Sequence, residues 1–274
     1  MNTTKLFTAY INIILAACLT LLFQAAYAGV AGHVQFVNGQ VQITSTSGQV
    51  RSLKKADAVN ESDTLTTAKD GSAQIKMLDG GLVAVRPDSK LKFDSFVFSG
   101  EADGNERSFF SLLRGGFRAI TGVVGHKNKA NYRITTAGAT IGVRGTDHET
   151  FVVVPGSEMA AIAPVGTYNK VNVGETVMTT GKGTINILPN QMGFTSAADQ
   201  LPQLQPINLN IFAPVSSPAL QGNGGKTTGA VSQSAVVDSI IQEQNAATGN
   251  AVPNNTILRP IIDDHGGAAP PSVY

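Results

Sequence analysis

Apolar and polar side chains alternate along the chain from Gly29 to about Ala198, and this alternation predicts a domain built of β-strands. In residues 72–77 every second side chain is apolar, which is the period of a strand with one buried face. Asp79-Gly80-Gly81 follows as a hairpin turn, because glycine adopts positive φ without strain. No helical period appears inside this region.

The same pattern recurs at short intervals, separated by glycine-containing breaks such as Arg114-Gly115-Gly116. The further strands expected from it are 82–85, 109–113, 117–120, 132–135, 139–143, 149–154, 167–173, 176–180 and 183–188. Short strands at this spacing are typical of a sandwich, barrel or solenoid. We therefore expect an all-β, short-stranded sandwich or solenoid-like domain over residues 29–198, large enough to fold on its own core.

The composition changes after Ala198. Residues 199–229 are rich in Pro, Gln and Gly and read as a linker. Residues 230–247 carry apolar side chains near helical spacing and predict a weak amphipathic helix, which either caps an edge of the β-domain or folds on a partner. Residues 248–274 have too little apolar surface to offset their ordering entropy and are expected to be a disordered tail. The C-terminal part is thus low in complexity and weakly helical.

The N-terminus has the three parts of a secretory signal peptide, over residues 1–28. Lys5 precedes an uncharged run at 6–26, and Ala26-Tyr27-Ala28 is a small-x-small cleavage pattern. Two alternatives stay open: an uncleaved anchor, because the run is long enough to span a bilayer, and a lipid anchor on Cys18, because residues 15–18 resemble a lipobox. We expect cleavage after Ala28 and an exported protein in the periplasm, outside the cell or on its surface, with no membrane span after the signal.

The composition argues against sites that need cysteine and against partners that need a strongly charged protein. The chain has one cysteine, Cys18, so the mature protein is expected to have no disulfide, thiol nucleophile or thiolate metal site. The net charge of +1 predicts no strong attraction to nucleic acid or to a membrane.

Residues 132–147 carry a pattern that resembles the signature of FecR domains. Val143-Arg144-Gly145-Thr146 matches its second part, whereas Thr136 stands where the family usually has proline. Glycine turns in the same order and spacing extend the resemblance over about residues 33–195. It implies an all-β, partly solenoid-like domain outside the cytoplasmic membrane.

The best-known members of that family are membrane regulators with a cytoplasmic anti-sigma segment, one transmembrane helix and a periplasmic part that senses an outer-membrane iron transporter. Only a few residues precede the apolar run here. We therefore expect an exported, stand-alone FecR-domain protein that lacks the anti-sigma segment.

Arg144 is the residue of the signature whose side chain can form charged hydrogen bonds. Its planar guanidinium could tie carbonyls or a carboxylate across strands. The interpretation we favour is structural: Arg144 stitches the turn and binds no ligand.

Asp147-His148-Glu149 has the residue types of a metal site. On a strand, however, His148 points away from its two neighbours, so the three side chains cannot converge on one ion. We expect no metal site here.

Basic residues gather between 107 and 146, a stretch without Asp or Glu. Such an excess suits an anionic glycan, lipid headgroups or an acidic partner, and the alternative is a solvated face paired with acidic strands from elsewhere. Besides Arg144, the candidate contact residues are Arg107, Arg114, Arg118, Lys127, Lys129 and Arg133.

No nucleophile elbow and no phosphate-binding loop occur in the sequence, so we expect neither an enzyme nor a cofactor. The leading hypothesis is a non-catalytic interaction or scaffold module at the bacterial envelope or surface, with an envelope protein or an anionic glycan as its partner and no nucleic acid. One alternative is a periplasmic regulator that acts through a separate membrane partner. Another is a binder of anionic glycan or cell wall. The oligomeric state is left open.

Overall fold

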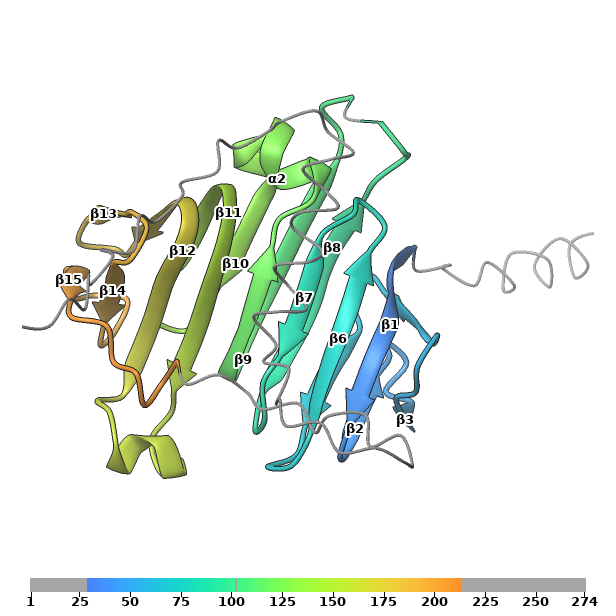
Figure 1. Ribbon diagram of the computed structural model, residues 1–274, viewed down its shortest axis with the longest axis horizontal. Helices are drawn as coiled ribbons and strands as arrows, with labels where there is room; N and C mark the ends of the chain where they lie inside the picture. Colours follow the sequence, from blue (N-terminus) through green and yellow to red (C-terminus); the bar gives the residue numbers. More distant parts are fainter. Residues whose placement is uncertain (1–28, 102, 213–274) are drawn as a thin grey trace, which may run out of the picture. The chain divides into compact units, whose positions relative to one another are not determined.

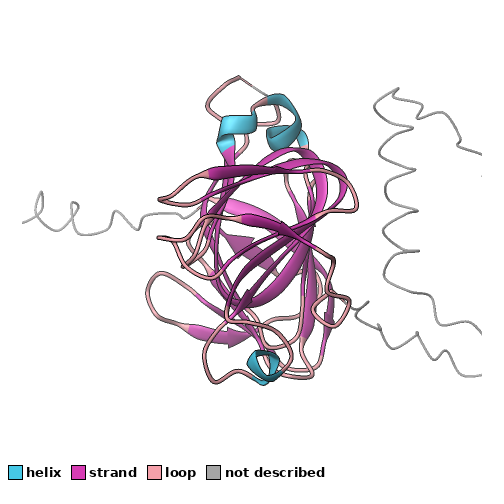
Figure 2. Cartoon of the chain, turned by 90° about the vertical axis from the view of Figure 1, so that its left-hand side faces the viewer, coloured by secondary structure: helices cyan, strands magenta, loops and turns pink. Residues whose placement is uncertain are grey.

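The computed structural model describes residues 29–101 and 103–212. The predicted signal peptide, the end of the predicted linker, the helix expected at 230–247 and the tail expected at 248–274 lie outside these residues. Hydrogen bonds join the described strands into one 15-stranded sheet, which folds over on itself into two facing layers (Figures 1 and 2). The all-β prediction is confirmed.

The first layer holds the chain's N-terminal strand near one edge and its last described strand at the other. In order of pairing it contains β4 (Ala58–Asn60), β1 (Val30–Asn38), β6 (Ser72–Met77), β7 (Leu82–Val85), β9 (Arg107–Ile120), β11 (Thr140–Val153), β12 (Gly166–Thr179), β14 (Met192–Thr195) and β15 (Gln203–Gln205).

The second layer is built from the intervening strands. In order of pairing it contains β3 (Val50–Ser52), β2 (Val41–Thr44), β5 (Thr64–Thr67), β8 (Lys90–Val97), the first half of β9, β10 (Tyr132–Thr135), the first half of β11, the second half of β12 and β13 (Thr184–Ile187).

Three long strands therefore belong to both layers, and each bends where it crosses between them. The bends lie at Gly115, Gly145 and Gly174, which have φ of 70°, 60° and 82°, a left-handed conformation that glycine adopts without strain. The ladders of β9 and β11 slip in register at these points, as expected for β-bulges that bend a strand.

These bends correct the sequence prediction of separate short strands. Residues 109–113 and 117–120 form one strand, and so do 139–143 with 149–154 and 167–173 with 176–180. Arg114-Gly115-Gly116, expected as a glycine turn between two strands, lies inside one strand, because the bulge redirects β9 into the facing layer without ending it.

The main core fills the space between the layers. Phe110 lies at its centre, with ring centroids 5.6 Å from Phe93, 5.7 Å from Tyr132 and 6.2 Å from Phe117. Phe117 comes from the first layer and the other three from the second, so the aromatic cluster holds the two layers together. Each large apolar side chain buried here contributes about 1.5–3 kcal/mol.

Short helices cover opposite ends of the strands (Figure 2). Helix α2 (Val123–Lys127) and the 3-10 turn η1 (Lys129–Asn131) lie at one end, and the 3-10 turn η2 (Glu158–Ala161) lies at the other. Asp79 accepts hydrogen bonds from the backbone N–H groups of Gly81 and Val124, which attaches the β6–β7 turn to α2. The sequence showed no signal for these short elements.

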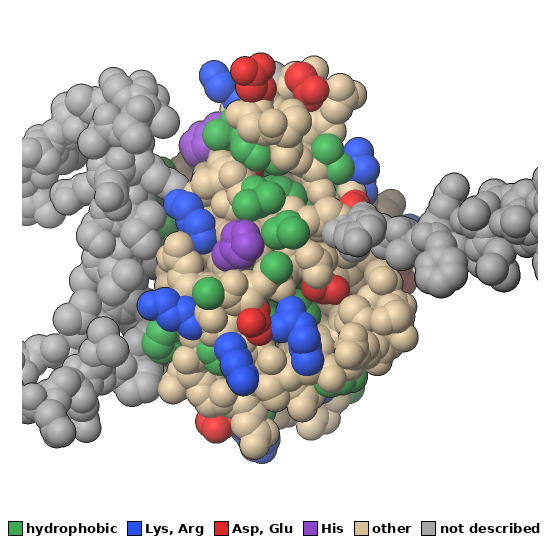
Figure 3. All heavy atoms as spheres, turned by 90° about the vertical axis from the view of Figure 1, so that its right-hand side faces the viewer, with side chains coloured by type: hydrophobic (Ala, Val, Ile, Leu, Met, Phe, Trp, Pro, Cys, Tyr) green, Lys and Arg blue, Asp and Glu red, His purple; other side chains and the backbone are tan. Residues whose placement is uncertain are grey.

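A second, smaller core lies on the outer face of the first layer. Residues Ile211 and Phe212 pack there against side chains of β11, β12 and η2, including Phe151, Tyr168 and Met159. Ile211 and Phe212 fall in the range predicted as linker, and β15 in the same range pairs with β14. At the edge formed by β1, β3 and β4, charged side chains of both signs are interspersed with apolar ones (Figure 3).

Candidate functional site

The signature residues Val143 to Thr146 form the bend of β11. Val143 is buried in the main core, and the backbone N–H of Thr146 donates to Thr121 Oγ1 at 2.8 Å. A Cβ on Gly145 would lie 2.7 Å from Nδ1 of His126 in α2, and one on Gly174 would collide with the carbonyl oxygen of Gly145. The signature therefore specifies a tightly packed corner that only glycine allows.

We expect Gly145→Ala to lower the free energy of unfolding by about 1–3 kcal/mol, because the alanine would keep a left-handed backbone and push against His126. Gly142→Ala is the matched control on the same strand: its Cβ would meet no atom within 4 Å, so the change is expected to stay within about 0.5 kcal/mol. Urea unfolding of both variants measures the difference, and equal losses would contradict this role of the corner.

Arg144 lies on the outer face of the second layer beside the corner. Its Nη1 is 3.3 Å from Oε2 of Glu175, the residue directly opposite on β12. With the Arg144 side chain 48% exposed, such a pair contributes about 1 kcal/mol or less. The pair joins β11 to β12 beside the corner, and the stitching role of Arg144 stays a prediction.

The candidate contact residues are divided among different parts of the described structure. Arg107 and Arg133 lie on the outer face of the second layer, where the guanidinium of Arg133 is 4.3 Å from the centre of the Phe109 ring. Lys127 and Lys129 belong to α2 and η1. Arg114 lies at the bend of β9 beside Asp88, and Arg118 lies on the outer face of the first layer beside Asp147.

The alternation around His148 places Asp147 and Glu149 on the opposite side of β11. His148 is fully buried in the main core against the rings of Phe117 and Tyr132. The side chains of Asp147 and Glu149 point to the outer face, where both accept hydrogen bonds from Asn172. Within residues 29–101 and 103–212, no group of three His, Cys, Asp or Glu side chains could hold a metal ion.

Asp147 and Glu149 anchor an outer-face ion network on β9, β11, β12 and the turn that follows β7. Arg118 donates to both oxygens of Asp147, at 2.8 and 2.5 Å. Glu149 pairs with Arg86 and with Lys170, whose Nζ is 3.0 Å away. Burial alone would raise the pKa of Glu149, but Arg86 and Lys170 outweigh it and hold that pKa below its usual range.

The ring nitrogens of His148 have few polar neighbours. Its Nδ1 is 3.5 Å from Thr150 Oγ1 and from Asn169 Nδ2, and its Nε2 is buried without a hydrogen-bond partner. Burial lowers the pKa of His148 to about 4, although the charges of Asp147 and Glu149 act in the opposite direction. The imidazole is therefore neutral near pH 7.

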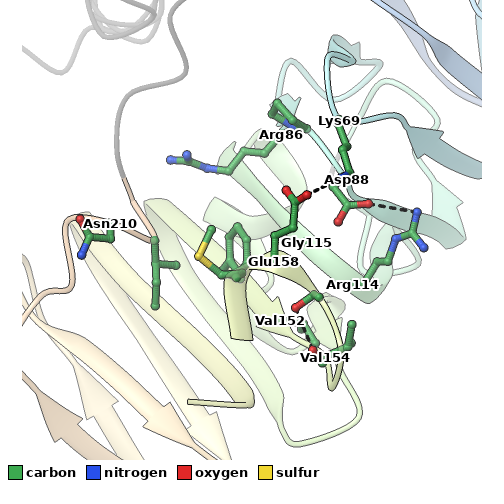
Figure 4. A pocket seen from close by; sticks show the side chains of 14 residues that line it. Lys69, Arg86, Asp88, Arg114, Gly115, Val152, Val154, Glu158 and Asn210 are labelled. Atoms are coloured by element: carbon green, nitrogen blue, oxygen red, sulfur yellow. Dashed lines mark hydrogen bonds and ion pairs between the residues drawn. The ribbon is translucent and has the colours of Figure 1, made fainter. Parts of the chain in front are cut away.

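A cavity of about 260 Å³ adjoins the ion network at the Gly115 bend. We call it the corner cavity. Arg86, Asp88 and Arg114 line it from one side, and Glu158 with the apolar side chain of Ile211 lines it from another. In Figure 4 Glu158 reaches toward Lys69, and Arg114 toward Asp88. The cavity thus combines paired charges at its rim with an apolar wall.

Sequence reasoning missed Arg86, Lys170 and Asn172 as members of the network. Each lies at an outward position of its strand or turn, and that alternation was the available signal. It could not show that β7 and β12 flank β9 and β11.

None of the helices in the described residues is both long and apolar enough to cross a membrane.

Comparison with known proteins gives one family match. Residues 63–162 match the FecR protein family. No curated protein matches the chain.

Among solved structures, a protein described as a cell surface anchoring domain is 31% identical over 23% of this chain and 84% of its own, with a TM-score of 0.23. A putative anti-sigma factor from Parabacteroides distasonis, solved in crystals at 1.65 and 2.50 Å, is 11% identical. The match covers 52% of this chain and 59% of the anti-sigma factor, with a TM-score of 0.40.

Proposed function

From the match of residues 63–162 to the FecR protein family, we propose that this chain is a non-catalytic interaction module of the bacterial cell envelope, exported by its signal peptide. It holds a partner protein and does not transform a small molecule. The partner is an envelope protein, and the corner cavity is the contact site.

The proposal rests on the ion pairs of the corner cavity, in which each charged lining residue has a partner of opposite charge. Lys69 pairs with Glu158, Arg114 with Asp88, and Arg86 with Glu149. The one hydroxyl group in the lining, that of Ser157, donates to the carbonyl of Val154 at 2.8 Å. Among the lining residues there is no histidine, cysteine or free hydroxyl to serve as base or nucleophile, whereas paired charges around an apolar wall suit a polypeptide side chain.

The backbone around the cavity supports a preformed contact. Asp88 has φ of 50°, and the following Ser89 exchanges hydrogen bonds of 2.8 and 3.0 Å with the backbone of Gly116. The turn is therefore locked onto the β9 bend. A rigid site binds at a lower entropic cost than a loop that must first be ordered.

The FecR match of residues 63–162 favours a second candidate, a periplasmic regulator that transmits a signal through a separate membrane protein. The two functions share the corner cavity and differ in the partner. A sensor, transporter or anti-sigma protein as partner supports regulation, and a structural envelope protein supports a scaffold.

A photo-crosslinking amino acid tests the contact site in the full chain within its own cell envelope. At Met159, on the cavity wall, we expect a crosslink to one partner of defined mass. At Asn186, on the far layer, we expect no crosslinked protein. Arg114→Glu should weaken binding about tenfold, a loss of about 1.4 kcal/mol, and should lower the crosslinking yield at Met159 accordingly. Equal crosslinking at both positions, or turnover of a small-molecule substrate by the pure protein, would overturn the proposal.

A further inference from the structure

The outer face of the second layer carries a row of directly paired side chains across its strands, nearly all of them with hydroxyl groups. Directly paired residues on β2, β5, β8 and β9 contribute Thr44, Thr64, Lys92 and Ser111. The row continues over β10, β11, β12 and β13 with Thr135, Thr140, Thr179 and Thr184. All eight side chains point outward, and seven of them end in a hydroxyl. We call them the hydroxyl row.

The row is regular because the register of the sheet sets its spacing. Neighbouring strands lie about 4.8 Å apart, so the seven intervals between eight positions span about 34 Å along the twist of the sheet. The β-branched threonines hold their hydroxyls in few rotamers. Thr179 Oγ1 and Thr184 Oγ1 are already 3.1 Å apart. The row is thus a preorganised line of donors and acceptors.

Positive charge flanks the hydroxyl row. The outward positions of the strands in this layer include two acidic residues, Asp94 and Glu175, and five basic ones, Lys90, Lys92, Arg107, Arg133 and Arg144. Asp94 is held by Lys92 at 3.1 Å and by the Ser111 hydroxyl at 2.6 Å. The excess of cations selects a ligand with negative charge.

One neighbouring position adds an apolar contact. Phe109 lies beside the row under the guanidinium of Arg133, and the residue opposite Arg133 on β11 is Gly142, above which there is open space. Because Gly142 has no side chain, a ring-shaped group has room beside Arg133 at this position. An aromatic face with an adjacent cation suits the C–H side and the acidic group of a sugar ring.

We propose that the hydroxyl row binds a linear anionic polysaccharide laid across the strands. Sugar hydroxyls exchange hydrogen bonds with the row, and the flanking cations pair with the acid groups. Hydroxyl groups repeat along the row as sugar units repeat along the polysaccharide, so individually weak contacts add up along the polysaccharide. This surface lies on the opposite layer from the outer-face ion network, and the inference does not depend on the partner proposed for the corner cavity.

Other anionic or lattice-like ligands fit the face less well. Binding of single-stranded nucleic acid relies on stacking aromatics, and among the outward strand positions of this layer Phe109 is the one aromatic residue. An ice-like water lattice fits a flat hydroxyl array, but Lys92 interrupts the row and carries a strongly hydrated charge.

Affinity electrophoresis and calorimetry with the full-length protein test the proposal. Polygalacturonate is the probe, dextran is the neutral control, and duplex DNA and anionic lipid vesicles are the charge controls. We expect binding to polygalacturonate that tightens with chain length up to about the 34 Å of the row. The affinity should fall at least about tenfold between 0.05 and 0.5 M NaCl.

Removing hydroxyls separates recognition from charge alone. Thr135→Val with Thr179→Val keeps shape and strand propensity and should weaken binding at least about tenfold. Thr46→Val, in the exposed β2–β3 turn, should leave it unchanged. No binding, equal affinity for DNA or vesicles, or equal loss in the Thr46 control would overturn the assignment, as would inhibition of ice growth without glycan binding. Circular dichroism verifies that each variant is folded.

Discussion

Lowering the pH from 7 to 4 is expected to reduce the free energy of unfolding of this domain by about 3 kcal/mol through His148 alone. The pKa of this histidine is about 4 in the folded protein and about 6.5 in an unfolded chain. Between those two pKa values, the His148 imidazole is protonated in the unfolded chain and stays neutral in the folded domain. The stabilisation is therefore complete above pH 6.5 and is lost progressively toward pH 4.

His148→Asn removes the titrating group and keeps an amide near the position of Nδ1. The variant is less stable at pH 7, because its smaller side chain leaves space between Phe117 and Tyr132. Its loss of stability between pH 7 and 4 should nevertheless be about 3 kcal/mol smaller than that of the unmodified chain. Urea titrations at four pH values measure both quantities, and parallel pH profiles would rule out His148 as the source.

Glu149→Gln should destabilise the domain by about 3–5 kcal/mol, because it leaves Arg86 and Lys170 in a buried site without their common carboxylate. The side chains of Glu149, Arg86 and Lys170 are 7%, 12% and 18% exposed, respectively, so water cannot replace the lost carboxylate. Thermal and urea unfolding at pH 7 measure the effect.

Glu175→Gln is the matched control for that change. It breaks the exposed pair with Arg144 and should cost about 1 kcal/mol or less. If the two substitutions cost the same, the outer-face ion network does not have the strength that its burial implies. A second check is acid titration: since the pKa of Glu149 is lowered on folding, its contribution is present above the usual carboxyl pKa and disappears as the pH falls through the lowered value.

The sequence was most informative where burial repeats every second residue. It located most strands of both layers, because side chains such as Ile75 and Phe110 must alternate with polar neighbours whichever strand lies beside them. It also separated His148 from Asp147 and Glu149, since opposite sides of one strand follow from local geometry alone.

Features set by strand order could not be predicted in this way. Gly115 looks the same in a hairpin turn and in a bend between layers, because both require positive φ. Arg86 meets Glu149 across 63 positions of sequence, and the hydroxyl row appears only once eight strands are in register. For the segment that ends the described chain, the available signal was the recurrence of large apolar residues, among them Ile207, Ile211 and Phe212, in a stretch otherwise rich in Pro, Gln and Asn.

The three strands that bend between the layers also constrain how the domain opens. In a sandwich whose sheets are joined only by loops, one sheet can separate from the other while its own ladders stay intact. Here β9, β11 and β12 carry consecutive residues of both layers, so sliding or parting the layers must break ladder hydrogen bonds at three corners at once. The two layers consequently form a single cooperative unit, with no hinge between them.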